Sequence, residues 1–501
     1  MKLLLSAAEM RACDNSTIEK MGVPSLVLME RAAISVCDVI LSRFEKCNNI
    51  GVICGPGNNG GDGVAVARIL HNKGFCTKVL IIGESKKFSE SLKQELSIAK
   101  NYGVELSYIK NRDSISPKEF SSFFSECDLI VDAMFGIGLT RGLDGNYKSA
   151  CQYINQSNKP VIAVDIPSGF DTDSGKLLGD AGVNATITVT FAYMKKGLVL
   201  GDCKEATGEI IVTDVGIYCK DNSTAKLLDD TVLDTIPWRP TIANKGTCGK
   251  VLIIAGSDKI YGACYLAALA ALCSGSGLVK IYTHYNNIGT IQSCLPEAMY
   301  TAYTNYDEVS LIPDISWADA IVVGPGLGTA KAASSILKTL SKTATVPVVI
   351  DADGLNVLAK DLSILDELSA VVPVILTPHL KEMERLCGIP VSEINYDMEN
   401  IASNFAKEHN CIVVLKNHTE VITSESGVYY CTSGNEALAT PGSGDVLAGI
   451  IGALLGQEMD AEDAAVAGCY VHGKAGTIAA KKVGIKGLLA RDIISNIHEL
   501  I

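Results

Sequence analysis

The sequence has no Cys-x-x-Cys pair and no cluster of Cys and His residues with the spacing of a zinc site, which excludes a structural zinc module. Its 17 cysteines stand singly along the chain. Scattered thiols are typical of a reducing compartment, where cysteine serves as a small core residue. We therefore expect a cytoplasmic protein.

Long apolar runs and a basic excess are also missing. No stretch is long and apolar enough to span a membrane, and the apolar residues 3–5 are followed at once by Glu9 and Arg11, which argues against a signal peptide. The formal net charge is -13, so neither a nucleic acid nor a membrane is expected as a partner. An anionic substrate would have to be held by local backbone donors.

The 501 residues suffice for two or more domains with sizeable cores. Short β-branched runs alternate with helical patterns in both halves, which predicts an α/β fold with parallel sheets covered by helices on both faces. Residues 216–240 interrupt this alternation with polar, acidic and proline-rich segments. We place a domain boundary near residues 219–223, between domains of residues 1–219 and 220–501.

The N-terminal half carries a glycine-rich segment, Asn58-Asn59-Gly60-Gly61-Asp62-Gly63, after a predicted strand at residues 50–54 and before a helix from residue 64. A loop in this place binds a pyrophosphate at the crevice of a parallel sheet, although this one lacks the Rossmann spacing and the P-loop ending. Asp132 and Asp165 each close a further strand and are expected in the same crevice. One strand-end aspartate is often only a turn residue, but the combination favours a site.

In the C-terminal half, the segment Gly442-Ser443-Gly444-Asp445 precedes an apolar run that reads as a buried helix. The free N–H groups and positive dipole end of such a helix bind an anion. A carboxylate beside a phosphate repels it, so we interpret Asp445 as the base for a hydroxyl that attacks phosphorus. The alternative role is a helix cap. Other candidates at predicted strand ends are Gly326, Gly328, Asp353, His379 and Lys416.

These motifs resemble a known family. Residues 58–63, 131–139 and 165–169 are similar to the NAD(P)H-hydrate epimerase domain, and residues 245–247, 324–328, 377–379 and 442–445 to the ADP-dependent NAD(P)H-hydrate dehydratase domain. The resemblance covers nearly the whole chain. It implies two doubly wound α/β domains, a Rossmann-like epimerase domain and a ribokinase-like dehydratase domain.

The resemblance implies metabolite repair of hydrated NAD(P)H. The N-terminal domain would interconvert the R and S hydrates at C6, and the C-terminal domain would dehydrate the S form to NAD(P)H with ADP, giving AMP and phosphate. Asp445 would be the base that lets the 6-hydroxyl take a phosphoryl group. The expected partners are small molecules, NADHX, NADPHX and ADP, and we expect a homo-oligomer.

Site residues follow from the same resemblance. In the epimerase domain, Asn59, Asp132 and Ser168 would hold K⁺, which suits their hard oxygen donors. Asp165 would contact the substrate and move the proton. The hydrate would contact Asn58, Asn59, Gly60, Gly61, Asp62, Gly136, Ile137, Gly138, Leu139, Thr140, Arg141, Gly142 and Asp165.

In the dehydratase domain, Asp445 would be catalytic, and the hydrate would contact Ala263, Gly326, His379 and Asp445. The adenine nucleotide, with Mg²⁺, would contact Lys416, Asn417, His418, Thr419, Glu420 and Gly444. Two positions depart from the family pattern: Lys381 precedes Glu382 where glycine is usual, and residues 417–420 are bulky and polar where small residues are usual. The choice between ADP and ATP therefore stays open.

Two other functions fit parts of the chain. A ribokinase-like kinase for a vitamin precursor alcohol would share residues 442–445 but would leave the N-terminal half unexplained. A non-enzymatic nucleotide-binding or scaffold protein would have no need of Asp132, Asp165 and Asp445.

Overall fold

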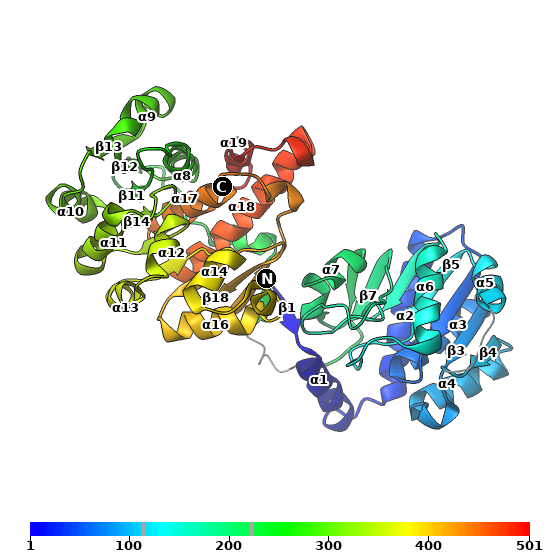
Figure 1. Cartoon of the computed structure of the whole chain (residues 1–501). Coiled ribbons are helices and arrows are strands. Elements are labelled where there is room, and N and C mark those ends of the chain that lie inside the picture. Colours follow the sequence, from blue (N-terminus) through cyan, green and yellow to red (C-terminus); the bar gives the residue numbers. More distant parts are fainter. Residues whose placement is uncertain (112–116, 220–224) are drawn as a thin grey trace. The chain divides into compact units, whose positions relative to one another are not determined.

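The computed structural model describes residues 1–111, 117–219 and 225–501 of the chain. These form two compact units, one of Leu3–Ser223 and one of Met1–Lys2 with Thr224–Ile501. Figure 1 shows that each unit has a sheet with helices packed around it. The boundary that we predicted near residue 220 lies outside the described residues.

The N-terminal unit is built on a parallel sheet with the strand order β4-β3-β2-β5-β6-β7-β9. Its strands are β2 (Asn49–Cys54), β3 (Cys76–Ile82), β4 (Glu105–Ile109), β5 (Leu129–Ala133), β6 (Val161–Val164), β7 (Ile187–Phe191) and β9 (Glu209–Thr213). The chain runs outward from β2 to β4 and then returns to β5 on the other side of β2. This reversal opens a crevice at the carboxyl ends of β2 and β5, where ligands of such sheets bind.

Helices cover both faces of this sheet. They are α2 (Ser25–Arg43), α3 (Asn58–Asn72), α4 (Glu90–Asn101), α5 (Pro117–Ser125) and α6 (Gly145–Gln156), and α1 (Ala7–Glu19) precedes them in the chain. Because side chains alternate along a strand, Val52 packs into the core beneath α2, α3 and α4, whereas Ile53 packs into the core beneath α5 and α6. Short β1 (Lys2–Leu5) pairs in parallel with β8 (Met194–Lys195).

The glycine-rich segment of residues 58–63 is not a loop, as we expected, but the first turns of α3. The prediction was wrong because the glycines serve close packing. A Cβ atom at Gly60 would lie 2.1 Å from the carbonyl oxygen of Gly55, and one at Gly63 would lie 2.4 Å from Cβ of Ala133 in β5. Glycine thus lets α3 begin immediately above the ends of β2 and β5.

The C-terminal unit has the strand order β13-β12-β11-β14-β15-β16-β17-β18-β19-β10. The strands are β10 (Ala225–Leu227), β11 (Lys250–Ile254), β12 (Leu278–His284), β13 (Met299–Tyr303), β14 (Ala320–Val323), β15 (Val348–Ile350), β16 (Val374–Leu376), β17 (Ile412–Leu415), β18 (Glu420–Thr423) and β19 (Val428–Cys431). Pairing is parallel from β13 to β17 and antiparallel through β18. The order reverses between β11 and β14, which places a second crevice there.

One face of this sheet is covered by α8 (Gly262–Cys273), α17 (Ser443–Gly456), α18 (Ala461–Val483) and α19 (Ala490–Ile494). The apolar α17 is buried along almost its whole length, as its sequence predicts. Small residues bring it close to its neighbours: a Cβ atom at Gly449 would lie 2.2 Å from the carbonyl oxygen of Ala267 in α8. This packing presents the amino end of α17 at the crevice.

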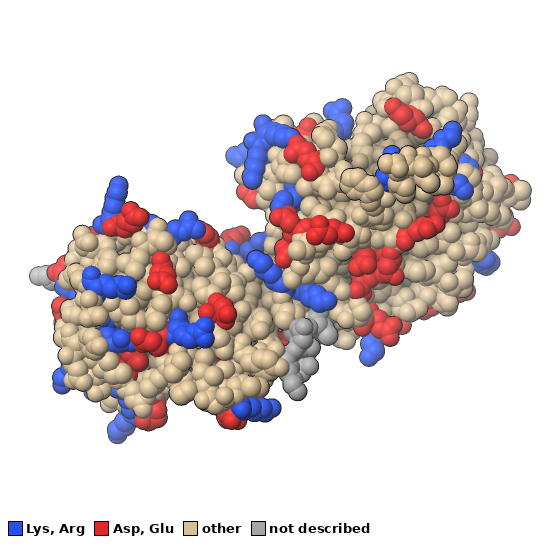
Figure 2. Space-filling model, turned by 180° about the vertical axis from the view of Figure 1, so that it is seen from behind, with Lys and Arg blue, Asp and Glu red and all other residues tan. Residues whose placement is uncertain are grey.

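None of the helices in the described part of the chain combines the length and apolar character needed to cross a membrane. On the face drawn in Figure 2, acidic and basic side chains are interspersed rather than separated into broad areas of one sign. An anionic ligand on such a surface depends on local donors, as the net charge of -13 also indicates.

Two candidate active sites

A cavity of about 520 Å³ opens beside the amino end of α3 in the N-terminal unit. Most of the predicted substrate residues line it: Asn58, Asn59, Asp62, Gly136, Ile137, Gly138, Leu139 and Asp165. Gly60 and Gly61 are not in the cavity lining. Because they have no side chain, Gly60 packs closely on Gly55 and Gly61 packs closely on Met29. Thr140, Arg141 and Gly142 are outside the lining.

Asp165 follows β6 with a left-handed backbone, φ +71°, which is unusual for a residue with a side chain. Its Oδ1 atom accepts hydrogen bonds from Lys195 Nζ at 2.6 Å and from Thr190 Oγ1 at 3.1 Å. Its Oδ2 atom lies 3.4 Å from the position that a Cβ atom would take at Gly136, a cavity residue. One oxygen is therefore held from within the protein while the other faces the cavity.

Lys195 also lines this cavity, and the sequence analysis did not name it. Its side chain is only 1% exposed, and besides Asp165 its Nζ donates to Thr190 Oγ1 at 2.9 Å and to the carbonyl oxygen of Phe191 at 3.0 Å. A buried ammonium group needs a carboxylate partner and acceptors for its other N–H groups, and Lys195 has both. No sequence signal separates Lys195 from the adjacent Lys196, because its burial depends on the tertiary fold.

Two further carboxylates line the same cavity, Asp14 from α1 and Asp62 from α3. Neither has a hydrogen-bond or ion-pair partner within the described part of the chain. Burial, and next the charge of Asp165, raises the pKa of both carboxyl groups. Because neighbouring carboxylates resist ionising together, the protonated forms of Asp14 and Asp62 are favoured relative to an isolated carboxyl group. Carboxyl groups in such an arrangement are suited to proton transfer.

Asp132 and Ser168, two of the predicted potassium ligands, are in direct contact. Ser168 donates to Asp132 from Oγ at 2.8 Å and from its backbone N–H at 2.8 Å. Burial raises the pKa of Asp132 to about 6, against the opposing effect of these hydrogen bonds. Within the described ranges, no basic side chain forms an ion pair with this fully buried carboxylate.

The donor set fits a hard monovalent cation. It combines the Asp132 carboxylate with the hydroxyl of Ser168, which lies 3.3 Å from the carbonyl oxygen of Phe135. The third predicted ligand, Asn59, has its Oδ1 atom 3.1 Å from the Cβ position of Gly136. Its Nδ2 atom is buried without a hydrogen-bond partner among the described residues, as expected of a side chain that meets a ligand.

In the C-terminal unit, Asp445 lies in the first turn of α17, and the N-cap of this helix is Gly442. The alternative that Asp445 is the helix cap is therefore wrong. Its carboxylate makes no hydrogen bond within the described residues, so both oxygens remain acceptors. Burial, followed by the charge of Asp351, raises its pKa to about 7 although Lys416 opposes the shift. A carboxyl group that titrates near neutrality is suited to general base catalysis.

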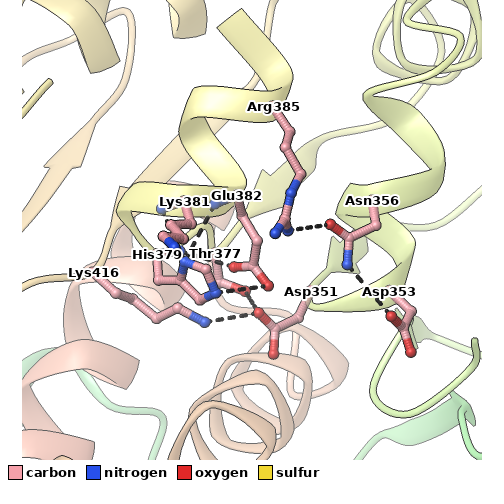
Figure 3. Close-up of polar contacts among 9 residues, drawn as sticks. All are labelled: Asp351, Asp353, Asn356, Thr377, His379, Lys381, Glu382, Arg385 and Lys416. Atoms are coloured by element: carbon pink, nitrogen blue, oxygen red, sulfur yellow. Dashed lines mark hydrogen bonds and ion pairs between the residues drawn. The ribbon is translucent and has the colours of Figure 1, made fainter. Parts of the chain in front are cut away.

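Figure 3 shows the largely buried ion pair of Lys416 and Asp351. The charges of both residues act on Asp445. Lys416 Nζ donates to Asp351 Oδ1 at 2.8 Å, and Thr377 Oγ1 donates to the same oxygen at 2.7 Å. Burial alone would lower the pKa of Lys416, but Asp351 and Glu382 outweigh it and raise the pKa. The sequence analysis named Asp353 instead of Asp351, because both follow the strand β15 and periodicity does not rank them.

Gly444, which has no side chain, lets α17 lie close to the ion pair of Lys416 and Asp351. A Cβ atom there would lie 3.2 Å from Lys416 Nζ and 3.5 Å from Asp351 Oδ2. The first turn of α17 and the lysine therefore approach each other closely. Backbone N–H groups at a helix amino end and an adjacent ammonium group form a good site for phosphate oxygens.

His379 begins α14 (Leu380–Cys387) as its N-cap, with Nδ1 accepting hydrogen bonds from the backbone N–H groups of Lys381 and Glu382. The backbone N–H of His379 in turn donates to Glu382 Oε2 at 2.9 Å. Burial is the first cause that lowers the pKa of His379, so the ring is neutral at pH 7, and its Nε2 atom lies 3.4 Å from Glu382 Oε1. Lys381 contributes only its backbone to this cap, and its side chain is exposed.

The other predicted residues of this unit are hydrate contacts, Ala263 and Gly326, and nucleotide contacts, residues 417–420. Ala263 and Gly326 are neighbours, since a Cβ atom at Gly326 would lie 3.0 Å from that of Ala263. Of the predicted nucleotide residues, Thr419 is fully buried and His418 is exposed. Asn417 bonds through Nδ2 to Asn395 at 2.9 Å, and Glu420 begins β18. Residues 417–420 thus form the turn that leads from β17 to β18.

Two family descriptions match the chain: "YjeF-related protein N-terminus" over residues 25–197 and "NAD(P)H-hydrate dehydratase" over residues 251–499. The bifunctional NAD(P)H-hydrate repair enzyme of Moorella thermoacetica is 35% identical over 98% of this chain and 95% of its own length. The enzyme of the same name from Escherichia coli is 32% identical over 99% of this chain and 93% of its own.

Among solved structures, the ADP/ATP-dependent NAD(P)H-hydrate dehydratase of Bacillus subtilis, co-crystallised with ATP and Mg²⁺, is 29% identical. It matches 56% of this chain and 98% of its own, with a TM-score of 0.48. The full-length matches to curated enzymes decide the assignment, since they include both halves in one chain. The chain therefore belongs to the family of bifunctional NAD(P)H-hydrate repair enzymes.

Proposed function

We propose that this chain restores hydrated NAD(P)H, with residues 1–219 as the epimerase domain and residues 220–501 as the dehydratase domain. The observation that carries the proposal is the presence of two separate sites with different chemistry, in a chain whose 35%-identical relative is a bifunctional repair enzyme. The N-terminal site offers buried carboxylates for proton transfer. The C-terminal site offers one base at a phosphate-binding helix end.

In the dehydratase domain, Asp445 accepts the proton of the 6-hydroxyl group as its oxygen attacks the β-phosphorus of ADP, and AMP leaves. The amino end of α17 and Lys416 bind the phosphate oxygens, and Ala263, Gly326 and His379 hold the hydrate. Phosphate then leaves C6 while C5 loses a proton to solvent, which forms the C5=C6 double bond and restores the nicotinamide ring. Mg²⁺ would supply charge neutralisation on the phosphates, as it does in phosphoryl transfer generally. ATP can replace ADP at the same donors, with its γ-phosphorus attacked.

In the epimerase domain, Asp165 contacts the substrate through Oδ2, and Asp14 and Asp62 exchange protons with the ring. Asn59, Asp132 and Ser168 would hold K⁺, which would supply positive charge for the anionic nucleotide. We also propose a cytoplasmic location, because the 17 free cysteines suit a reducing compartment.

The test is an absorbance assay with a mixture of R and S hydrates of NADH, and with ADP or ATP and Mg²⁺. We expect NADH to be restored from the whole mixture, because the epimerase converts R into S while the dehydratase consumes S. Recovery of only the S fraction would contradict the epimerase assignment. A stable phosphorylated product without NADH would instead support the kinase alternative.

A further inference from the structure

A second cavity lies in the C-terminal unit, outside all of the residues assigned so far. Its volume is about 440 Å³, and its lining includes Tyr261, Leu266, Ile291, Pro441, Ala490 and Arg491. These residues come from the start of α8, from α9 (Ile288–Cys294), from the residue before Gly442 and from the start of α19. We call it the α8–α19 cavity.

The α8–α19 cavity adjoins the reacting centre. Gly442 has a left-handed backbone, φ +87°, and a Cβ atom there would lie 2.4 Å from Leu266 Cδ1 and 3.2 Å from Ala490 Cβ. The same position is 3.8 Å from Asp445 Oδ2. The backbone of a single glycine therefore separates the cavity wall from the carboxylate that we propose as the base. Gly262, also in the lining, directly precedes the predicted substrate residue Ala263.

Two glycines at the amino end of α17, Gly442 and Gly444, lie close to different residues. Gly444 approaches Lys416 and Asp351, whereas Gly442 approaches Leu266 and Ala490. The co-substrate phosphates are proposed to bind on the Lys416 side. Of the proposed hydrate contacts, His379 pairs with Lys416, whereas Ala263 and Gly326 adjoin each other at the start of α8. A substrate whose 6-hydroxyl group meets Asp445 can therefore extend along the start of α8 toward the α8–α19 cavity.

The lining has the chemistry of a nucleotide subsite. The ring of Tyr261 is 53% exposed, so it can stack on a base. Arg491 is exposed, and its guanidinium group has no hydrogen-bond or ion-pair partner among the residues that the structure describes. In a chain of net charge -13, an unpaired arginine beside a cavity is a local site for a phosphate.

We propose that the α8–α19 cavity binds the adenosine half of the hydrated dinucleotide, with Tyr261 stacked on the adenine and Arg491 paired with a phosphate of that half. This inference rests on the proposed dehydratase function. Both ADP and the hydrated dinucleotide contain an adenine, and the proposal gives each its own place. ADP binds on the Lys416 side of the α17 amino end, and the adenosine half of the substrate binds on the Leu266 side.

The test compares hydrated NADH with hydrated nicotinamide mononucleotide, which has the same reacting ring but no adenosine half. We expect Arg491→Gln and Tyr261→Ala each to raise KM for hydrated NADH about tenfold, as loss of a charged hydrogen bond or a stacked base does. KM for the mononucleotide and for ADP, and kcat for all substrates, should stay unchanged. Tyr261→Phe should retain the wild-type KM, and Lys338→Gln, an exposed lysine on α11 (Lys331–Thr343), is the matched control.

Equal changes with both hydrates, or no change with either, would overturn the subsite while leaving the proposed function intact. A loss of oligomer size in the Tyr261 or Arg491 variants, measured by sedimentation, would also overturn it, because the cavity would then be an interface between copies. Absence of turnover of both hydrates by the unaltered chain would overturn the proposed function and the subsite together.

Discussion

At the scale of single residues, the carboxyl group of Asp445 has to be ionised before it can take a proton. Burial raises its pKa to about 7, so about half of the molecules hold the base form at neutral pH. The charged form is disfavoured in the folded protein, since the unfolded value is 3.8. The same property that makes Asp445 a suitable base therefore lowers the stability of the fold at higher pH.

We expect Asp445→Asn to abolish dehydration and to keep epimerisation. Because a folded-state pKa above the unfolded value binds protons preferentially in the folded state, stability decreases as pH rises from the unfolded value to about 7. The amide should remove this decrease and raise the free energy of unfolding at pH 8 by about 1–2 kcal/mol, less than the full linkage because the group is partly solvated. Denaturant unfolding of the wild type and of Asp445→Asn at pH 8 measures this difference in the free energy of unfolding. Equal values for the two proteins would contradict the prediction that burial raises the pKa of Asp445.

The pH dependence of dehydration by the wild type tests the pKa of Asp445 independently. The dehydration rate constant kcat/KM should rise with pH until the carboxyl group is ionised, and then level off, with a midpoint of about 7. Epimerisation, which does not use Asp445, should follow a different profile. Identical profiles for both reactions would mean that a group other than Asp445 controls dehydration.

Lys195 is a positioning residue for Asp165 rather than a group that meets the substrate, because its donors are taken by Asp165, Thr190 and the Phe191 carbonyl. We expect Lys195→Met to lower epimerisation at least about 100-fold, since Asp165 would lose the contact that fixes Oδ1. The unpaired buried carboxylate should also lower the free energy of unfolding by about 3–5 kcal/mol.

The matched control for that variant is Lys148→Met, which removes an exposed ion pair with Asp180. An exposed pair contributes at most about 1 kcal/mol, so this variant should epimerise normally. The hydrate assay with excess dehydratase activity reports the epimerisation step. A normal epimerisation rate in Lys195→Met would show that Asp165 does not need its hydrogen bond from Lys195.

At the scale of elements, the amino end of α17 is held in place by its neighbours. Ser443 Oγ lies 3.0 Å from Nε2 of His472 in α18, a buried ring whose pKa burial lowers to about 4 and which is therefore neutral. Gly449 allows α17 to lie directly on α8. The helix end is thus rigid before a nucleotide arrives, as electrostatic preorganisation requires.

We expect Gly444→Ala to weaken nucleotide binding through steric contact with Lys416, whose Nζ would lie 3.2 Å from the new methyl group. KM for ADP should rise about tenfold as the lysine shifts from the phosphate position, corresponding to the loss of a charged hydrogen bond. Gly487→Ala, where a Cβ atom meets nothing within 4 Å, is the control and should behave as the wild type. An unchanged KM in Gly444→Ala would place the phosphates elsewhere.

At the scale of the whole molecule, the two sites belong to separate compact units and are proposed to depend on different ions. Replacing K⁺ by tetramethylammonium should slow epimerisation by an order of magnitude or more and leave dehydration of the S hydrate unchanged, because only the N-terminal site has the Asp132 and Ser168 donor set. Thermal unfolding of the N-terminal unit should shift upward on K⁺ addition. A parallel loss of both activities would contradict separate sites.

Much of this architecture could be predicted from local sequence. The alternation of short apolar strands with helices predicts both parallel sheets, and the positions of Asp165 and Asp445 at element ends predict that they face a crevice. The prediction of a buried helix at the apolar run that follows Asp445 is confirmed, and the helix begins earlier than predicted, at Ser443. The extent of α3 was predicted wrongly, because glycines in a helical first turn and in a loop have the same local sequence signal.

The partners of the catalytic carboxylates were decided only by the tertiary structure. Lys195, Thr190 and Asp14 come from different elements than Asp165, and Asp351 meets Lys416 across 65 positions of the chain. The sequence alone determined which segments form strands, which turns carry glycine and which acids end a strand, because these depend on neighbouring residues. Burial, pairing and pKa depend on what lies opposite each side chain in space, and that is set by how the strands and helices pack.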